Sequence, residues 1–425
     1  MMIKLFLFSL PFLSFSLFKF SGEDLLVSYF TSALLILNLF IQKKDAKIYF
    51  PREAMIFLSF LGYLSIVLAF KYFAGTIIAK NLSQFVVFVI YFIFYLLIVN
   101  VLYLQKYRII SKIVSYFVFF CVVFSIYAYF QAFLPSQAMF YTFFRNASST
   151  FNIWSPFLFK TKETYATFLG LQRVTGLAPE PTMWAMFLAV PLALLFPRLY
   201  FRFNLKTLAA FLVIFFCLLL TYGRAGWLGL FLALLLFPLF FIKGLKKKIY
   251  ILSYIVVLII ALFFIFYMDF SLGIDYSKIE RFWGMSNAWN MFVHNPVFGV
   301  GVGGFETNRE GYLFQPGGTY SNGVGGNYAY NFYLRILAET GIVGLFFWIL
   351  FIRRVFKKIF WTFDYVKRSE DQKTIVSGLG LAFFSILFSW INFDAINFMY
   401  IWFIFALITA LPGIIMREQK NADSN

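Results

Sequence analysis

The chain has 425 residues, of which 62% are hydrophobic and 13% charged, and its formal net charge is +18. A soluble domain has about 25% charged residues, so this composition excludes a soluble globular protein and predicts an integral membrane protein. The two cysteines, Cys121 and Cys217, lie inside apolar runs and fit neither a disulfide pair nor a metal site.

Long apolar runs occur from the first residues to the last. A bilayer crossing needs about 20 apolar residues, and the runs of suitable length predict spans at 3–20, 23–41, 53–73, 83–104, 110–133, 182–197, 207–222, 225–242, 249–268, 332–352, 375–393 and 395–412. The first run lacks a small-residue cleavage site, so we interpret it as a retained span rather than a signal peptide. The expected fold is all-α, a single integral membrane domain over residues 1–425 with about twelve transmembrane helices.

The Lys and Arg residues indicate the orientation of these spans. If the N-terminus is cytoplasmic, most of them fall in loops on the cytoplasmic side, as with Lys43, Lys44, Lys246 and Lys247. This bias predicts that both termini are cytoplasmic. It also accounts for most of the net charge, so we expect the lipid bilayer and no nucleic acid as a partner of the basic residues.

Two long segments then face the outside. They are an outer loop at 134–181 and a larger one at 269–331, between the ninth and tenth predicted spans. The second loop is rich in Gly, Trp, Tyr and Phe, which argues against disorder. Loops of this length are uncommon unless they are functional or disordered, so we expect the active region here.

Arginines on the outer side run against the charge bias. We single out Arg173, Arg224 and Arg281 because each has a Gly or an aromatic residue close by. A guanidinium group binds phosphate bidentately and stays charged, so the three predict a binding site for an anion. The alternative is that each arginine reaches from a helix end to the membrane interface. Arg145 and Arg309 are further candidates.

Glu180 is the candidate carboxylate for catalysis. It lies between Pro179 and Pro181, directly before a predicted span. In this position it can take a proton from a hydroxyl group, or it can stabilise the helix N-terminus as a capping acid. The only histidine, His294, is a possible base or a turn residue before Asn295.

Three other patterns remain open or have a structural interpretation. Arg335 and Glu339 are four residues apart, so they share a helix face and are expected to neutralise each other, with a role in the site as the alternative. Asp394, in the last outer turn, is ambiguous. The run from Gly299 to Gly304 matches the dinucleotide pattern G-x-G-x-x-G, but no βαβ unit surrounds it, and we interpret it as a close-packed turn.

In their order and spacing, several elements resemble the O-antigen ligase and O-antigen polymerase family of bacterial envelope proteins. The likeness is strongest across 170–350. Its elements are Arg173 with Gly176, Glu180-Pro181, Thr221-Tyr222-Gly223-Arg224-Ala225-Gly226, Arg281, Pro296-Val297-Phe298-Gly299-Val300-Gly301, Asn331-Phe332-Tyr333-Leu334 and Ala338-Glu339-Thr340-Gly341.

The resemblance implies a membrane glycosyltransferase of the inverting type. Such proteins transfer a glycan from polyprenyl (undecaprenyl) pyrophosphate to an acceptor sugar hydroxyl on the outer face of the cytoplasmic membrane. The resemblance implies neither a metal nor another cofactor. The implied partners are the lipid-linked glycan, an acceptor glycan or glycolipid, a chain-length regulator and a flippase.

One departure bears on the choice between polymerase and ligase. Many ligases of this family have His-Asn where this chain has Tyr330-Asn331. The departure favours a polymerase that joins repeat units of a surface polysaccharide, with Glu180 as the base, Tyr330 as a hydrogen-bonding catalytic group and Arg281 at the leaving group. The alternatives are a ligase that uses a terminal acceptor, a transporter or flippase of lipid-linked glycans, and a non-catalytic scaffold.

Overall fold

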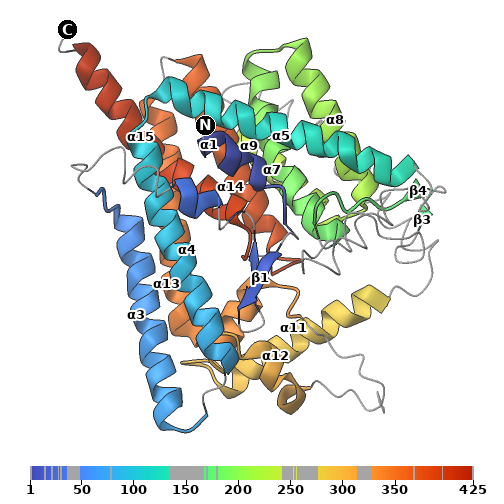
Figure 1. The fold of residues 1–425 in the computed structure, drawn as a ribbon, viewed down its shortest axis with the longest axis vertical. Helices are drawn as coiled ribbons and strands as arrows, with labels where there is room; N and C mark the ends of the chain where they lie inside the picture. The colour runs from blue at the N-terminus through green and yellow to red at the C-terminus, as the bar shows by residue number, and fades with distance from the viewer. Residues whose placement is uncertain are drawn as a thin grey trace.

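The computed structural model describes residues 2–13, 16–20, 23–26, 28, 31–35, 48–76, 79–133, 167–168, 171–178, 180–241, 252, 255, 276–313, 328–366, 369–394 and 396–423. These residues form a helical bundle with two short hairpins (Figure 1). The helices are α1 (Met2–Ser9), α3 (Arg52–Phe73), α4 (Ala79–Tyr103), α5 (Tyr107–Phe133), α7 (Pro181–Phe201), α8 (Leu205–Thr221), α9 (Arg224–Phe241), α11 (Tyr276–His294), α12 (Phe305–Asn308), η2 (Arg309–Tyr312), α13 (Phe332–Tyr365), α14 (Glu370–Ser389) and α15 (Met399–Asp423). The hairpins pair β1 (Ser16–Phe20) with β2 (Glu23–Leu26) and β3 (Thr167–Phe168) with β4 (Leu171–Gln172).

Seven of the described helices are long and apolar enough to cross a membrane. They are α3, α4, α5, α7, α13, α14 and α15, while α8 and α9 are apolar but shorter. The prediction of a helical membrane protein is therefore confirmed. The predicted number of twelve spans stays a prediction, because 249–268 and much of 23–41 lie outside the described residues.

The structure differs from the sequence prediction at 3–20. The first helix ends at Ser9, strand β1 occupies the end of this predicted span, and β2 occupies the start of the next one, 23–41. Pro11 lies two residues after the end of the helix, and a proline in a helix interior removes a backbone donor and clashes with the preceding turn. The chain therefore leaves the helix there, and the Leu13 amide donates to the Leu177 carbonyl at 3.1 Å.

The bundle is held together by close helix contacts and by a cluster of large aromatic side chains. Helix α14 packs against α7 and α9, α15 against α4, and α13 against α3. Small residues allow this approach, as where Gly226 of α9 lies against Ala185 of α7. Three fully buried tryptophans join α13, α14 and α15, with ring centroids 6.0 Å apart for Trp348 and Trp390 and 6.2 Å apart for Trp348 and Trp402.

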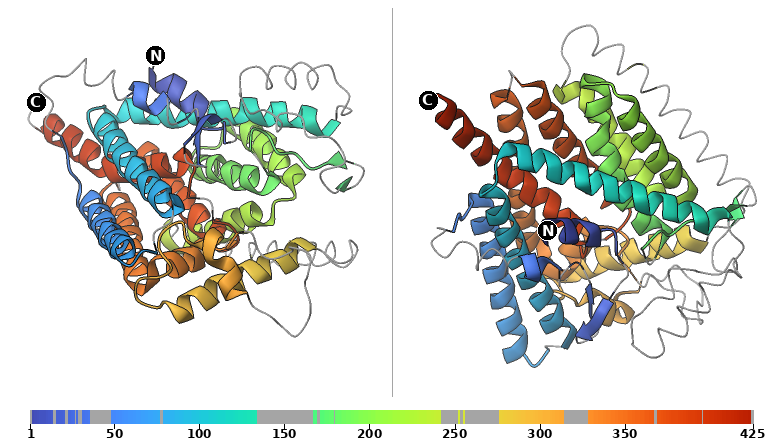
Figure 2. Two further views of the ribbon diagram at one scale, coloured as in Figure 1. Left: turned by 60° about the horizontal axis from the view of Figure 1, so that its bottom comes forward. Right: turned by 45° about the horizontal axis from the view of Figure 1, so that its top comes forward.

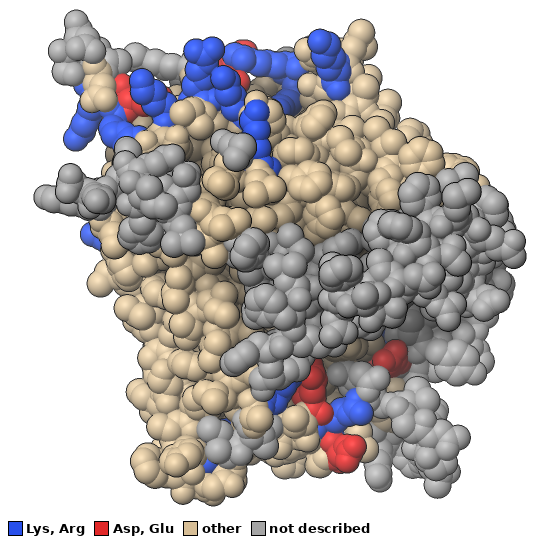
Figure 3. Space-filling view, viewed as in Figure 1, with Lys and Arg blue, Asp and Glu red and all other residues tan. Residues whose placement is uncertain are grey.

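One end of the bundle carries most of the exposed basic side chains, and we call it the basic end (Figure 3). Polar contacts join its loops: the Tyr107 hydroxyl donates to Asp371 at 2.9 Å, and Arg202 lies 3.4 Å from the same carboxylate. The Tyr107 amide also donates to Glu418 of α15 at 2.8 Å. The α4–α5, α7–α8 and α13–α14 connections and the end of α15 thus lie together, as the alternation of spans predicts.

The opposite end, which we call the site end, contains α11, α12 and the start of α13 (Figures 1 and 2). The segment predicted as the large outer loop, 269–331, thus contains the 19-residue helix α11, which packs against α13. Most of the other predicted outer loop, 134–181, lies outside the described residues. The site end is therefore built by ordered elements from distant parts of the chain.

Helix α13 is interrupted at Gly341, where φ is 65° and ψ is −169°. The turn that follows α11 lies against this break. The amide of Val300 donates to the carbonyl of Ala338 at 2.9 Å, and the amide of Ile342 donates to that of Pro296 at 2.9 Å. A Cβ on Gly341 would overlap the Val297 carbonyl, so glycine is required both by the backbone conformation and by the close approach. The G-x-G-x-x-G run is thus a close-packed turn that fixes α11 to α13.

Candidate functional site

A cavity of about 130 Å³ lies at the site end. Its charged lining comes from five separate segments: Lys80 of α4, Glu180 before α7, Glu306 of α12, Arg335 of α13 and Asp394 between α14 and α15. Tyr328 and Phe393 add aromatic walls. A pocket with apolar walls and a few convergent polar groups is the usual form of a ligand site.

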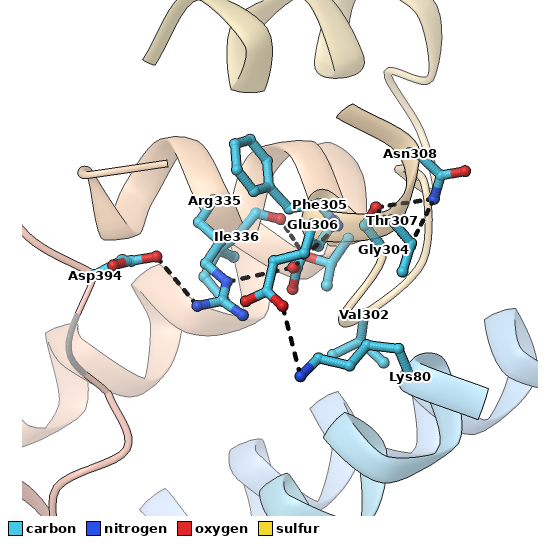
Figure 4. A network of polar contacts seen from close by, with 12 residues as sticks. Lys80, Val302, Gly304, Phe305, Glu306, Thr307, Asn308, Arg335, Ile336 and Asp394 are labelled. Carbon is cyan, nitrogen blue, oxygen red and sulfur yellow. Dashed lines mark hydrogen bonds and ion pairs between the residues drawn. The ribbon is translucent and has the colours of Figure 1, made fainter. Parts of the chain in front are cut away.

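Arg335 is held between two carboxylates at the floor of this cavity (Figure 4). Its Nη1 lies 3.1 Å from Asp394 Oδ2 and its Nε lies 3.3 Å from Glu339 Oε1. The three side chains are 11%, 6% and 2% exposed. Such burial is tolerable because each charge is paired and hydrogen-bonded. The expected contact between Arg335 and Glu339 is present, and Asp394 is the second partner.

Lys80 and Glu306 form a second ion pair at the mouth of the cavity (Figure 4). Lys80 Nζ lies 3.5 Å from Glu306 Oε2, and the side chains are 23% and 38% exposed. Helix α12 is placed there by its own contacts with α4 and α13. The Phe305 amide faces Glu339 Oε1 at 3.4 Å, and the Asn81 side chain donates to the Val302 carbonyl at 2.8 Å.

Arg281 and Tyr330 meet beside the cavity. The Arg281 guanidinium carbon lies 5.8 Å from the centroid of the Tyr330 ring, within the range of a cation–π contact. Burial and a hydrogen bond to Glu280 raise the pKa of the Tyr330 phenol above its ordinary value. Tyr330 has a positive φ of 53°, which is uncommon for a bulky residue and is found at functional sites.

Glu180 begins helix α7 and faces the same region. Its backbone is extended, Pro181 occupies the first helical position, and its side chain makes no capping hydrogen bond. The carboxylate lines the cavity instead, and its charge raises the pKa of Tyr330 after the larger effects of burial and of Glu280. Glu180 is the N-cap residue of α7, so of the two sequence interpretations the capping acid is left only with the favourable charge at a helix N-terminus.

Arg173 and Arg224 lie at the turn between α8 and α9, which packs against the start of α7. Arg173 Nε donates to the Thr221 carbonyl at 3.0 Å, and its Nη2 donates to the Tyr222 carbonyl at 3.3 Å. Tyr222 has a positive φ of 50° and ends α8, and α9 begins two residues later at Arg224. A Cβ on Gly223 would lie 3.3 Å from the Pro181 carbonyl oxygen, so this turn packs directly against the segment that carries Glu180.

The candidate residues therefore form two groups around the start of α7. Arg173 and Arg224 belong to the α8–α9 turn, and Arg281 with Tyr330 belongs to the contact between α11 and α13. Glu180 lies next to both groups. Its neighbour Pro181 contacts the α8–α9 turn, and the charge of the Glu180 carboxylate raises the pKa of Tyr330. All five residues lie at the site end, since α7 runs from Pro181 to Arg202 at the basic end.

His294 lies elsewhere. It is the last residue of α11, it is exposed, and its Nδ1 is 2.8 Å from the Asn290 carbonyl oxygen. It is not among the residues that line the cavity. Of the reserve arginines, Arg309 lies on η2, while Arg145 lies outside the described residues.

Sequence reasoning missed four charged or polar groups of the site: Lys80, Glu280, Glu306 and Tyr328. For Lys80 a signal was available, because it stands on the predicted outer side against the charge bias. Glu280 precedes Arg281 directly and could have been considered with it. Nothing local indicates Glu306 or Tyr328, since their role follows from contacts with distant segments.

The chain was compared with known protein families and with curated proteins, and no curated protein matches it. Residues 208–349 match the family described as O-antigen ligase. The matched part runs from α8 into α13 and includes Arg224, Arg281, Tyr330 and Arg335. This part of the chain is thus similar to the O-antigen ligase family, and the seven apolar helices of the described residues are those expected of a membrane protein.

Proposed function

We propose that the protein is an inverting glycosyltransferase of the cytoplasmic membrane that polymerises repeat units of a surface polysaccharide. The donor is a glycan linked to polyprenyl pyrophosphate, and the acceptor is a sugar hydroxyl on a second repeat unit. The reaction takes place at the site end, on the extracytoplasmic face, with both termini in the cytoplasm. A chain-length regulator and a flippase would act with it.

The observation that carries the proposal is the position of Glu180 next to the turn of Arg173 and Arg224 and near Tyr330, which Arg281 contacts. Arg173 and Arg224 lie at the turn that packs on Pro181, and Arg281 lies over Tyr330, whose phenol is within the field of the Glu180 carboxylate. A transfer from a pyrophosphate needs fixed positive charge at the leaving group and a proton acceptor at the nucleophile. Both requirements are met around the start of α7.

In the proposed reaction, the acceptor hydroxyl oxygen attacks the anomeric carbon of the donor sugar from the face opposite the pyrophosphate. The bond between this carbon and the phosphate oxygen breaks, and its electron pair leaves with the pyrophosphate. The hydroxyl proton passes to Glu180. The products are polyprenyl pyrophosphate and a glycan with an inverted linkage.

The guanidinium groups stabilise the charge that develops on the pyrophosphate oxygens. Preorganised cations in a partly dry site are more effective there than in water. In this proposal they do what a divalent cation does in other transferases, so the reaction needs no metal. Tyr330 stays protonated because its pKa is raised, so it serves as a hydrogen-bond donor and not as the base.

Purified protein in detergent, supplied with lipid-linked repeat units, tests the proposal. We expect Arg173→Ala, Arg224→Ala and Arg281→Ala each to abolish polymer formation and release of polyprenyl pyrophosphate while the protein stays folded. Arg309→Ala is the comparison variant, because Arg309 lies on η2 within the same matched residues and belongs to neither group of candidate residues around the start of α7. Normal chain lengths from all three variants would contradict the pyrophosphate site.

A ligase is the second candidate, because the matched family is described as O-antigen ligase. Surface glycan from a deletion strain separates the two. Loss of long chains with single repeats retained indicates a polymerase, whereas accumulation of lipid-linked polymer indicates a ligase. With the purified protein reconstituted into liposomes, a glycan that only changes leaflet without a new linkage would indicate a transporter and would contradict both.

A further inference from the structure

Helix α11 is apolar on two faces. On the inner face, Ala288 and Met291 are fully buried in a cluster that includes Ala338 of α13. On the outward face, the side chains of Trp289 and Val293 are each more than half exposed. A helix face that meets water is normally polar, so the outward face of α11 is not that of a helix surrounded by water.

The turn after α11 extends this exposed apolar surface. The side chain of Phe298 is more than half exposed and that of Val297 nearly half. The Phe298 ring stacks against Tyr63 of α3 with 6.4 Å between ring centroids, and the Val297 carbonyl lies against Gly341 of α13. The four exposed residues of this segment, which we call the α11 apolar face, are Trp289, Val293, Val297 and Phe298.

The α11 apolar face continues the exposed surface of a spanning helix. Ile342, Phe346 and Ile349 of α13 are each more than half exposed, and their spacing places them on one side of the helix. Ile342 directly follows the Gly341 break, and its amide donates to the carbonyl of Pro296 in the turn at 2.9 Å. The α11 apolar face thus begins where the exposed face of α13 ends. Since α13 is long and apolar enough to cross a membrane, the continuous surface indicates the same surroundings, which are acyl chains.

The length of α13 places the α11 apolar face at membrane depth. Exposed charges on α13 begin at Arg353 and Arg354, towards the basic end. From Ile342 to Arg353 the helix rises about 16 Å, whereas the hydrocarbon layer is about 30 Å thick. The Gly341 break therefore lies inside this layer, and the rest of its thickness is at the level of the turn and α11. In Figure 1, α11 lies across the direction of α3 and α4, as a helix at a membrane surface does.

The backbone at the Gly341 break is paired within the protein. Besides the two bonds already described between the break and the turn, the Glu339 carbonyl accepts from the Gly301 amide at 2.9 Å. The Thr340 carbonyl accepts from the Tyr63 hydroxyl at 2.6 Å. Non-helical backbone occurs at membrane depth only where the protein or a water-filled cavity satisfies its polar groups. The pairing therefore suits a break that lies within the hydrocarbon layer.

We infer that the α11 apolar face is embedded in the acyl chains of the leaflet at the site end. Part of the predicted outer loop, 269–331, is then a membrane-seated element. The occupant is bilayer lipid, because the face continues the surface of a spanning helix and because Trp289 is of a residue type that gathers at membrane interfaces.

This inference needs only that the protein spans a membrane, and it does not depend on the transferase reaction. It has a consequence for that reaction if the proposed function holds. Arg281 lies on the same helix and contacts Tyr330. A helix seated in the leaflet holds the Arg281 guanidinium near the headgroups, where the pyrophosphate of a lipid-linked donor lies.

Spin labels on single cysteines measure what surrounds the face. The purified protein is reconstituted into liposomes of phosphatidylcholine and phosphatidylglycerol. Trp289→Cys, Val293→Cys and Val297→Cys report on the face, and Phe346→Cys is the lipid reference on α13. Glu310→Cys is the water reference, because Glu310 is exposed on η2 at the same end. Both native cysteines are buried, and the unsubstituted protein treated in the same way gives the background.

We expect oxygen, which concentrates in acyl chains, to relax the three face labels as strongly as the label at Phe346. A water-soluble nickel chelate should relax the label at Glu310 several-fold more than the face labels. Stronger relaxation of the face labels by nickel than by oxygen would show that water surrounds them. Little relaxation by either would show that another segment or a second copy covers them. Either result would overturn the inference.

Photolabelling of the unmodified protein gives a second test that does not depend on variant folding. The liposomes then contain phosphatidylcholine with a diazirine in the acyl chain. Trypsin releases the peptides 282–309 and 336–353, which have no internal Lys or Arg. Both should carry lipid adducts, and those on 282–309 should lie on the α11 apolar face. Detection of 282–309 without an adduct, beside labelled 336–353, would overturn the inference. Neither test measures activity, so a protein that forms no polymer would count against the proposed function and leave this inference standing.

Discussion

Gly341→Ala should destabilise the protein strongly, because the α13 break depends on that glycine. The backbone at Gly341, with φ 65° and ψ −169°, lies in a region open almost only to glycine, and forcing another residue into it costs about 1–3 kcal/mol. A Cβ there would also overlap the Val297 carbonyl, and overpacking of this kind adds about 1–3 kcal/mol. The expected loss is therefore about 2–6 kcal/mol, a large part of a typical stability of about 5–15 kcal/mol.

Thermal unfolding of the detergent-solubilised protein, followed by loss of the monodisperse chromatographic peak, measures this loss. We expect the midpoint temperature of Gly341→Ala to fall by about 5 °C or more and the transferase activity to fall with it, since the turn joins α11 to α13. Gly62→Ala is the control. Gly62 lies in α3 with open space at the Cβ position, so alanine there should be neutral or stabilising by up to about 1 kcal/mol. Equal midpoints for the two variants would refute the reasoning.

Three further predictions concern the site end. Asp394→Asn removes one of two buried carboxylates from Arg335, which should destabilise the protein by about 3 kcal/mol; an unchanged unfolding midpoint would contradict this. Tyr330 has a raised pKa, so the stability that its protonated phenol contributes is present below about pH 10 and is lost as the pH rises above that value. Unfolding midpoints measured from pH 8 to 11 should therefore fall less steeply for Tyr330→Phe than for the wild type. Arg173→Lys cannot reproduce both donations to the Thr221 and Tyr222 carbonyls, and we expect a loss of about 1 kcal/mol in stability with reduced kcat; activity equal to that of the wild type would argue against a role for this geometry.

The helical part of the fold was predictable where a long apolar run stands between polar residues. The predicted spans at 53–73, 83–104 and 110–133 correspond to α3, α4 and α5, because each run has polar or charged residues at both ends. At 3–20 the hydropathy predicted a membrane span that the structure does not form. Hydropathy does not take into account that a proline such as Pro11 is incompatible with a helix interior. The length of α13 was underestimated, because Arg353, Arg354, Lys357 and Lys358 end the apolar run while the helix continues to Tyr365.

Only those features of the site that depend on residues close together in the sequence could be predicted. The proline after Glu180 indicated a helix start, and the separation of Arg335 from Glu339 indicated a shared helix face, and both are present. The partner Asp394 could not be deduced, because it lies in a turn after the next helix and reaches Arg335 only through the packing of the bundle. For the same reason, the sequence pattern does not indicate the contact between Lys80 and Glu306. This contact joins the first half of the chain to the second.

The origin of the cavity walls has a consequence for biogenesis. Residues from the first quarter of the chain, such as Lys80, share the cavity with Asp394 and Phe398, which are synthesised last. A chain leaving the ribosome therefore cannot assemble this chamber until its final two helices have entered the membrane. A copy truncated before these helices would lack this wall of the cavity and the contact between Asp394 and Arg335.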